Sequence, residues 1–154
     1  MPETIKYTYE EIEDKCVAIF NKIKQDGFKA DYILGISVGG LFPAILFARL
    51  FDTKNFSSIS VCSYTGKVRG DIKVINIPDK ELLKGKNVLI VDDIADSGST
   101  IKFVSELLKK DYSVMDARTA VILINKSNCK YYPNYSSEEI NQWIDFPWDK
   151  FEKK

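Results

Sequence analysis

The sequence predicts an α/β domain whose central sheet is mostly parallel. Short apolar runs rich in β-branched residues alternate along the chain with segments whose apolar residues recur at helical spacing. This alternation is typical of parallel strands joined by crossover helices, and small-residue turns separate the two kinds of segment. The length of 154 residues is that of one domain with a sizeable core, so we expect residues 1–154 to form a single domain.

An amphipathic helix is the first predicted element. Thr8 followed by Glu11 has the spacing of a capping box, which satisfies free backbone N–H groups where a helix begins. The apolar residues that follow share one helical face: Ile12, Cys16, Ile19, Phe20 and Ile23. Gly27 is placed to end the helix, because glycine readily adopts the left-handed conformation that closes many helices.

Two units of strand, small-residue turn and helix follow. In the first, a strand at 31–36 leads through a glycine turn at 37–40 into a helix at 41–51. In the second, a strand at 88–91 leads through a turn into a helix at 101–110. Such turns meet at the carboxyl ends of the strands, where open α/β sheets bind their ligands.

Three further strands are predicted at 56–63, 73–77 and 117–124, each an apolar run bounded by polar residues. The segment 64–71 is polar, contains glycine and has no periodicity. We therefore expect 64–77 to be a flexible loop with its return strand.

Composition excludes several classes of function. Lys plus Arg and Asp plus Glu number 22 each, so the protein has no net charge with which to attract nucleic acid. The absence of histidine removes the Ser-His-Asp and Cys-His nucleophilic schemes and histidine zinc sites. Any chemistry must then use carboxylates, lysines, backbone amides and a metal ion.

We expect a cytoplasmic protein without integral membrane association. No run approaches the roughly 18 apolar residues of a membrane span, and the N-terminus lacks the regions of a signal peptide. Three widely separated cysteines indicate reduced thiols in the core rather than a disulfide framework or a zinc site.

The segment Val88–Thr100 combines an apolar strand, three carboxylates and a small-residue turn at the start of a helix. Free N–H groups of Gly98, Ser99 and Thr100 at a helix N-terminus are suited to bind a phosphate. A Walker loop is excluded, because the pattern GxxxxGK[ST] does not occur. The turn therefore predicts a phosphate site that needs no lysine.

The three carboxylates lie beside this turn. Asp92 and Asp93 point to opposite sides of an extended chain, so one can accept hydrogen bonds from vicinal hydroxyls while the other approaches hydrated Mg²⁺. Asp96 lies inside the turn, next to whatever the phosphate carries. The combination predicts a site for a sugar phosphate.

This segment resembles the signature for 5-phosphoribosyl 1-pyrophosphate in type I phosphoribosyltransferases: four apolar residues, two acids, two apolar residues, an acid, then Ser/Thr, Gly and Ser/Thr. The resemblance implies that family's fold, a mostly parallel central sheet flanked by helices with a small flexible hood. It also implies that Asp92 and Asp93 bind the ribose hydroxyls and Mg²⁺, with Asp93 as the metal ligand. The other residues implied to bind the activated sugar phosphate are Ala95, Asp96, Ser97, Gly98, Ser99 and Thr100.

A second loop, within 33–44, resembles the pyrophosphate loop of 6-oxopurine phosphoribosyltransferases. The residues implied to hold the diphosphate are Ser37, Val38 and Gly39, and the resemblance also implies a cis peptide between the first two. The family commonly has Arg or Lys at the position of Val38, a departure that leaves open whether diphosphate affinity is weakened. Lys67 and Arg69 on the expected mobile loop are candidates to supply the missing charge.

The segment 142–149 resembles the base-binding segment of the bacterial xanthine-guanine phosphoribosyltransferases, and Lys126 matches their base-reading lysine. The lysine ammonium suits the oxygen at purine C6 and faces the amino group of adenine unfavourably. Trp143 can stack on the purine plane. Backbone carbonyls of Ile144 and Asp149 can accept hydrogen bonds from the opposite edge of the base.

Together the resemblances imply Mg²⁺-dependent transfer of the 5-phosphoribosyl group from 5-phosphoribosyl 1-pyrophosphate to N9 of a 6-oxopurine, a reaction of purine salvage. Guanine, xanthine and hypoxanthine are not ranked by the sequence. Asp96 is the implied catalytic residue, acting on the purine N7 proton as general base. Residues 125–150 would form the base-binding hood, and the family implies a homo-oligomer, either dimer or tetramer.

Two alternatives accompany this expectation. A regulator could keep the same fold to sense 5-phosphoribosyl 1-pyrophosphate or to bind RNA without turnover, which Val38 favours and the intact acids disfavour. A receiver domain also has two aspartates after an apolar run, but there the pair follows the first strand. Too few residues follow Asp93 to complete a five-stranded receiver.

Overall fold

The computed structural model describes residues 3–63 and 72–153. The expected mobile loop at 64–71, with Lys67 and Arg69, lies outside the described residues. Among the residues that are described, no helix is long and apolar enough to cross a membrane.

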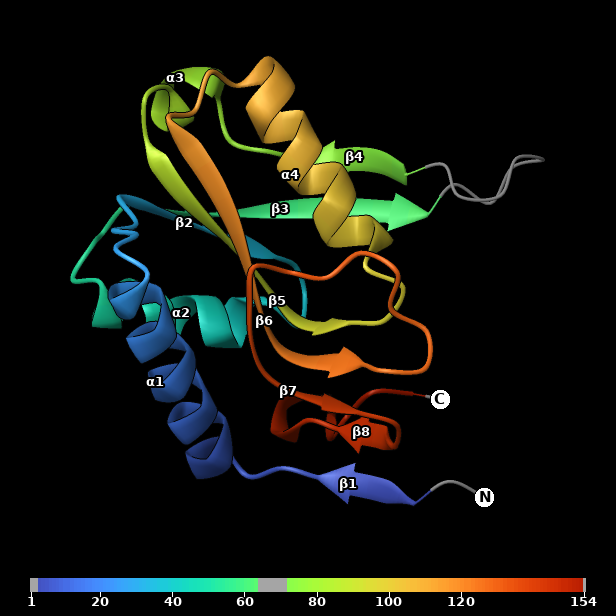
Figure 1. Cartoon of the computed structure of the whole chain (residues 1–154). Helices are drawn as coiled ribbons and strands as arrows, with labels where there is room; N and C mark the ends of the chain where they lie inside the picture. The colour runs from blue at the N-terminus through green and yellow to red at the C-terminus, as the bar shows by residue number, and fades with distance from the viewer. Residues whose placement is uncertain (1–2, 64–71, 154) are drawn as a thin grey trace.

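A six-stranded sheet forms the centre of the molecule (Figure 1), with the order β4-β3-β2-β5-β6-β7. All neighbouring strands are parallel except β3 and β4, which are antiparallel. The strands span Tyr32–Ile36 (β2), Phe56–Ser63 (β3), Ile72–Asn76 (β4), Asn87–Ala95 (β5), Asp116–Asn125 (β6) and Tyr135–Ile140 (β7). The mostly parallel α/β fold predicted from the alternating pattern is confirmed.

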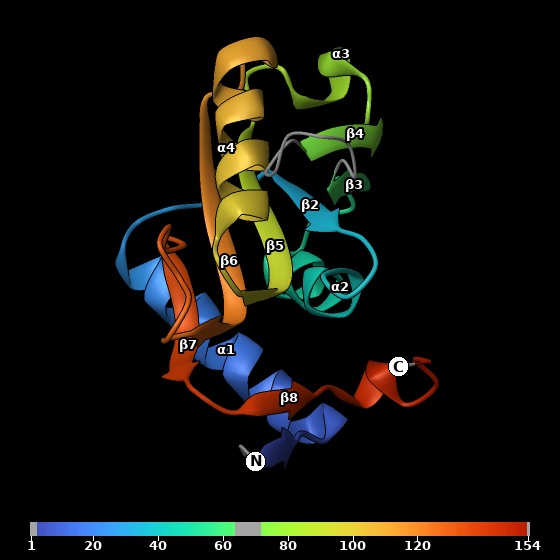
Figure 2. The same ribbon diagram turned by 90° about the vertical axis from the view of Figure 1, so that its right-hand side faces the viewer.

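Helices cover both faces of this sheet, as Figure 2 shows from the side. The helices are α1 (Tyr9–Gln25), α2 (Leu41–Leu50), α3 (Lys80–Leu83), α4 (Ser99–Asp111) and the 3-10 helix η1 (Pro147–Asp149). Two buried clusters hold the layers together, one beneath α1 and α2 and the other beneath α3 and α4. Burial on both faces explains why β2 and the first half of β5 read as continuous apolar runs.

The first helix begins where the sequence places it. Thr8 accepts a hydrogen bond from the Glu11 N–H at 3.1 Å, and the Glu11 carboxylate accepts one from the Thr8 N–H at 3.2 Å. Both hydrogen bonds of the capping box are therefore present. Gly27 follows the helix with a φ of 79°, a conformation that residues with a β-carbon rarely adopt.

Two short strands outside the central sheet were not predicted. Thr4–Lys6 (β1) pairs in parallel with Trp143–Asp145 (β8), so a segment near the start of the chain lies beside the expected base-binding segment. Three-residue strands leave almost no periodic pattern in a sequence. Within 125–150, the unpredicted β7 belongs to the central sheet, whereas β8 and η1 lie outside it.

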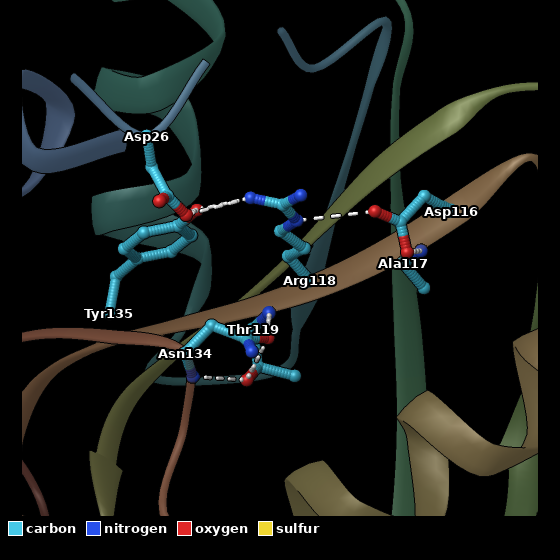
Figure 3. Close-up of polar contacts among 7 residues, drawn as sticks. All are labelled: Asp26, Asp116, Ala117, Arg118, Thr119, Asn134 and Tyr135. Carbon is cyan, nitrogen blue, oxygen red and sulfur yellow. Dashed lines mark hydrogen bonds and ion pairs between the residues drawn. The ribbon is translucent and has the colours of Figure 1, made fainter. Parts of the chain in front are cut away.

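A cluster of charged and polar side chains lies where β6 and β7 begin, at the side of the sheet that we call its amino edge (Figure 3). Arg118 donates to the Asp26 carboxylate at 2.8 Å, to the Tyr135 hydroxyl at 2.7 Å and to the Asp116 carboxylate at 3.1 Å. Tyr135 also donates to Asp26 at 2.6 Å. We call these four residues the amino-edge cluster. They join the end of α1 to the beginnings of β6 and β7.

Candidate active site

The acid pair lies at the carboxyl end of β5, in the middle of the sheet. The strand extends to Ala95, beyond the predicted end at Val91, because pairing with β6 continues through Asp92, Ile94 and Ala95. The two aspartates therefore alternate along a true strand and point to opposite sides. The Asp93 N–H donates to Asp92 Oδ1 at 2.8 Å.

Burial raises the pKa of both carboxyl groups. The pKa of Asp92 lies well above its usual value, because burial and then the neighbouring charge of Asp93 disfavour its ionised form. Burial also raises the pKa of Asp93, although hydrogen bonds offset part of the rise, including one from the Ile94 N–H at 2.7 Å. No ion pair among the described residues neutralises either group. A bound cation would relieve this repulsion.

The predicted phosphate turn leads from β5 into α4. Gly98 precedes the helix with a φ of 86°, and a Cβ there would lie 2.0 Å from the Tyr131 carbonyl oxygen, so only glycine fits. The Ser97 hydroxyl accepts from the Ser99 N–H at 3.2 Å and bonds the Ser99 hydroxyl at 2.7 Å. The turn thus presents hydroxyls and the N-terminus of a 13-residue helix at the edge of the sheet.

The second predicted loop lies beside the acid pair. The Ser37–Val38 peptide is cis, as the resemblance implies. Ser37 Oγ bonds Ser60 Oγ at 2.6 Å, which ties the loop to β3. Asp93 packs so closely on Gly39 that a Cβ on this glycine would lie 2.0 Å from Asp93 Oδ2. The glycine is therefore required by the position of the carboxylate.

Two adjoining clefts open at this edge. The smaller has a volume of about 260 Å³ and brings together Ser37, Val38, Gly39, Asp92, Asp93 and Thr100. The larger, about 690 Å³, is lined by Asp96 and by the predicted base-binding residues Trp143, Ile144 and Asp149. Val38, Gly39 and Asp93 line both clefts. A ligand with an anionic part and a planar apolar part can therefore occupy both at once.

Aromatic rings form one wall of the larger cleft. Trp148 stacks on Phe42 of α2 with ring centroids 5.1 Å apart, and on Phe146 at 4.8 Å. Trp143 is 62% exposed and lines the cleft, so its ring is available to a planar ligand. Lys126 is exposed just after β6 and is not among the residues that line this cleft.

Two asparagines that the sequence analysis did not single out contact Asp96. Asn125 Nδ2 donates to Asp96 Oδ1 at 2.7 Å, and Asn128 Nδ2 donates to the same oxygen at 3.0 Å. The sequence does contain a signal, because Asn125 and Asn128 flank a polar turn directly after a buried strand. Such a turn lies at the same sheet edge as the acids, where β5 and β6 run in parallel.

The acid pair offers oxygen ligands to a hard divalent cation. No group of three or more His, Cys, Asp or Glu side chains in residues 3–63 and 72–153 is arranged to hold a metal ion by itself. Mg²⁺ commonly binds through only one or two carboxylates, with water and substrate phosphates as its other ligands. Asp92 and Asp93, with their raised pKa values, fit this incomplete kind of site.

Comparison with known proteins agrees with this geometry. Residues 7–151 match the sequence profile of the phosphoribosyl transferase domain. The xanthine-guanine phosphoribosyltransferase of Cereibacter sphaeroides is 35% identical over 119 residues, which cover 76% of this chain and 68% of the relative. The enzyme of the same name from Gluconobacter oxydans is 30% identical over 155 residues, covering 96% and 88%.

The fold is also similar to that of solved structures. The crystal structure of a purine phosphoribosyltransferase from Pyrococcus horikoshii superposes with a TM-score of 0.82 at 27% sequence identity. The match covers 98% of this chain and 97% of that one, so the similarity of fold extends beyond the central sheet to nearly the whole chain.

Proposed function

The chain belongs to the phosphoribosyltransferase family, and from this premise we propose that it transfers the 5-phosphoribosyl group of 5-phosphoribosyl 1-pyrophosphate to N9 of a 6-oxopurine. The products are a nucleoside 5′-monophosphate and pyrophosphate, as in purine salvage. One observation carries the proposal: the smaller cleft, which is lined by the acid pair and by Thr100 of the phosphate turn, shares Val38, Gly39 and Asp93 with the larger, aromatic cleft. Relatives named for xanthine and guanine support the choice of base.

The phosphate turn binds the 5′-phosphate of the sugar. The N-terminus of α4 carries a partial positive charge, and Ser97, Ser99 and Thr100 add hydroxyl donors around it. Asp92 and Asp93, in the strand that precedes this turn, accept hydrogen bonds from the ribose hydroxyls. These contacts fix the sugar with its anomeric carbon between the two clefts.

Mg²⁺ is the cofactor that this arrangement supports, with Asp93 as its protein ligand. When bound, the ion supplies positive charge that stabilises the leaving pyrophosphate. The Ser37 N–H already donates to the Ile59 carbonyl at 2.9 Å, so it is the backbone amides of Val38 and Gly39 that bind the same group. Val38 carries no charge. Among the described residues, it is therefore these backbone amides that stabilise the leaving pyrophosphate, together with the bound ion.

The larger cleft holds the purine. Trp143 stacks on its plane, and the carbonyls of Ile144 and Asp149 accept from its C2 edge. Lys126 donates to the oxygen at C6, which requires its flexible side chain to turn toward the cleft when the base binds. A donor at this position disfavours adenine.

Asp96 acts on the base as it is glycosylated. Its carboxylate lines the larger cleft, where it accepts the N7 proton while N9 attacks the anomeric carbon. An Asp96→Asn variant keeps the size of the side chain and loses the proton acceptor. We expect kcat to fall by about 10²-fold or more, with affinity for ribose 5-phosphate retained.

A turnover assay tests the proposed function directly. The protein is incubated with Mg²⁺, 5-phosphoribosyl 1-pyrophosphate and, in parallel, guanine, xanthine, hypoxanthine or adenine, and nucleotide formation is measured. We expect turnover with at least one 6-oxopurine, poor turnover with adenine and none after chelation of the metal. Preference for adenine would contradict the role of Lys126, and absence of turnover with every base would contradict the function.

Two properties of the whole molecule complete the proposal. We expect a cytoplasmic enzyme, tested by fractionation of the cells that make it. We also expect a homo-oligomer, dimer or tetramer, tested by light scattering of the purified protein.

A further inference from the structure

The Asp96 carboxylate is held by two carboxamides on one of its oxygens. Asn125 Nδ2 lies 2.7 Å and Asn128 Nδ2 lies 3.0 Å from Oδ1. In the described part of the chain, Oδ2 receives no such bond. The exposed side chain of Asp96 is thus fixed at one oxygen, and the other remains available at the wall of the larger cleft.

The orientation of the Asn125 amide is set by a further contact. Its Oδ1 accepts a hydrogen bond from the Ser127 N–H at 3.2 Å. A flipped amide would place its oxygen against the Asp96 carboxylate and its NH2 group against the Ser127 N–H, and both bonds would be lost. The NH2 group of Asn125 must therefore point at Asp96.

The turn that carries Asn128 is also fixed by backbone bonds. The Asn128 N–H donates to the Asn125 carbonyl at 3.2 Å, and the Cys129 N–H donates to the same oxygen at 2.9 Å. Both donors are therefore in place before any ligand binds. Preorganised groups of this kind cost little ordering entropy when the reaction begins.

These side-chain bonds are not needed to join the two loops. The N–H groups of Lys130 and Tyr131 donate to the Ser97 carbonyl at 3.0 and 3.3 Å, and Gly98 packs under Tyr131. The backbone already connects the turn after β6 to the phosphate turn. What Asn125 and Asn128 add is control over the Asp96 side chain.

We propose that Asn125 and Asn128 are positioning residues, which hold Oδ1 of Asp96 so that Oδ2 faces the N7 proton of the purine. The inference rests on the proposed function and gives it a mechanism of alignment. A carboxamide suits this role because it donates hydrogen bonds and does not compete for the proton. Displacement of a catalytic group by about 1 Å can cost a factor of 10² in rate, so alignment of an exposed side chain matters.

The test is a mutant cycle between the asparagines and Asp96. We expect the double variant Asn125→Ala/Asn128→Ala to lower kcat by about 10- to 100-fold, while the Kd of 5-phosphoribosyl 1-pyrophosphate with Mg²⁺ changes less than about twofold. In an Asp96→Ala background the same double substitution should lower kcat no further, because its effect passes through the missing carboxylate.

Two further variants separate positioning from a general loss of structure. Asn128→Gln retains the donor and should recover most of the rate lost in Asn128→Ala. Asn21→Ala removes an exposed asparagine of α1 that lines neither cleft, and it should leave kcat unchanged. If the double asparagine substitution lowers kcat by the same factor in the Asp96→Ala background as in the unsubstituted enzyme, the inference is overturned and the proposed function still stands. Absence of turnover in the unsubstituted enzyme would overturn both.

Discussion

The acidic residues at the amino edge and at the carboxyl edge of the central sheet differ in whether a cationic side chain pairs with them. At the amino edge, the carboxylates of Asp26 and Asp116 both bond Arg118, and the Tyr135 hydroxyl completes the cluster. At the carboxyl edge, Asp92 and Asp93 lie side by side without an ion pair to any described residue, and burial raises the pKa of each. At the amino edge each carboxylate has a cationic partner, and at the carboxyl edge a ligand must supply one.

This difference separates residues that stabilise the fold from residues that bind. An acid pair without a cationic partner costs stability, because burial disfavours the ionised form of both groups and the charge of Asp93 further disfavours ionisation of Asp92. A substrate that brings a divalent cation recovers this cost as binding free energy. Substitutions at the carboxyl edge should therefore change activity more than stability, and those at the amino edge should do the reverse.

The largest expected effect is that of Asp93→Asn. Loss of the metal ligand and acceptor should lower kcat/KM by about 10²- to 10³-fold, since the group stabilises charge that develops in the reaction. The free energy of unfolding should not fall, because an uncompensated carboxylate is replaced by a neutral amide. Initial rates of nucleotide formation and urea unfolding measure the two quantities. A variant that was unstable but fully active would reverse the comparison.

Gly39→Ala should act on the same edge through shape alone. The new Cβ would overlap Asp93 Oδ2, so the carboxylate must move away from its position between the clefts. We expect kcat/KM to fall at least about tenfold, equivalent to about 1.4 kcal/mol. Gly85→Ala is the matched control, because it strains a backbone with a φ of 70° in open space and should cost stability without changing kcat/KM.

Arg118→Ala tests the other edge. It removes three hydrogen bonds and a guanidinium that lies 4.6 Å from the centre of the Phe28 ring. The free energy of unfolding should fall by about 1–2 kcal/mol, a modest value because the ion pairs are partly exposed. kcat/KM should stay constant at a temperature where the variant is folded. Arg49→Ala, on the exposed face of α2, serves as the control and should cost under about 0.5 kcal/mol.

The smallest effect concerns the pH dependence of stability without substrate or metal. Because the pKa of Asp92 is higher in the folded protein than in the unfolded chain, the folded state binds more protons between these two values. The free energy of unfolding therefore falls as pH rises through this window. Asp92→Asn should remove this part of the dependence, so that the variant is more stable than the unsubstituted protein above the window. Parallel curves for the two proteins between pH 4 and 9 would refute this explanation.

Much of the central architecture could be predicted from periodicity. The buried strands have continuous apolar runs, and α1 has both a capping box and an apolar face. β7 was missed because its sequence, Tyr-Ser-Ser-Glu-Glu-Ile, is polar, as suits an edge strand held mainly by backbone bonds to β6. β1 and β8 were missed because pairing between distant three-residue segments leaves no local pattern.

The part of the site that could be predicted from the sequence is the part whose residues are contiguous in the chain. Asp92, Asp93 and the phosphate turn are contiguous, so their proximity is fixed by the strand-turn-helix sequence itself. The contacts of Asp96 with Asn125 and Asn128 depend on the register between β5 and β6, which no single segment encodes. The distance of Lys126 from the larger cleft likewise depends on a side-chain conformation that its position in the sequence does not determine.

The pairing of β1 with β8 has a consequence for the order of folding. The strands lie far apart in the sequence, so they can pair only after β8 has been synthesised and has left the ribosome. A nascent chain can pair β2 to β6 and form the acid pair before the wall that carries Trp143 exists. Substitutions that prevent β1 from pairing should therefore affect purine recognition more than sugar-phosphate binding.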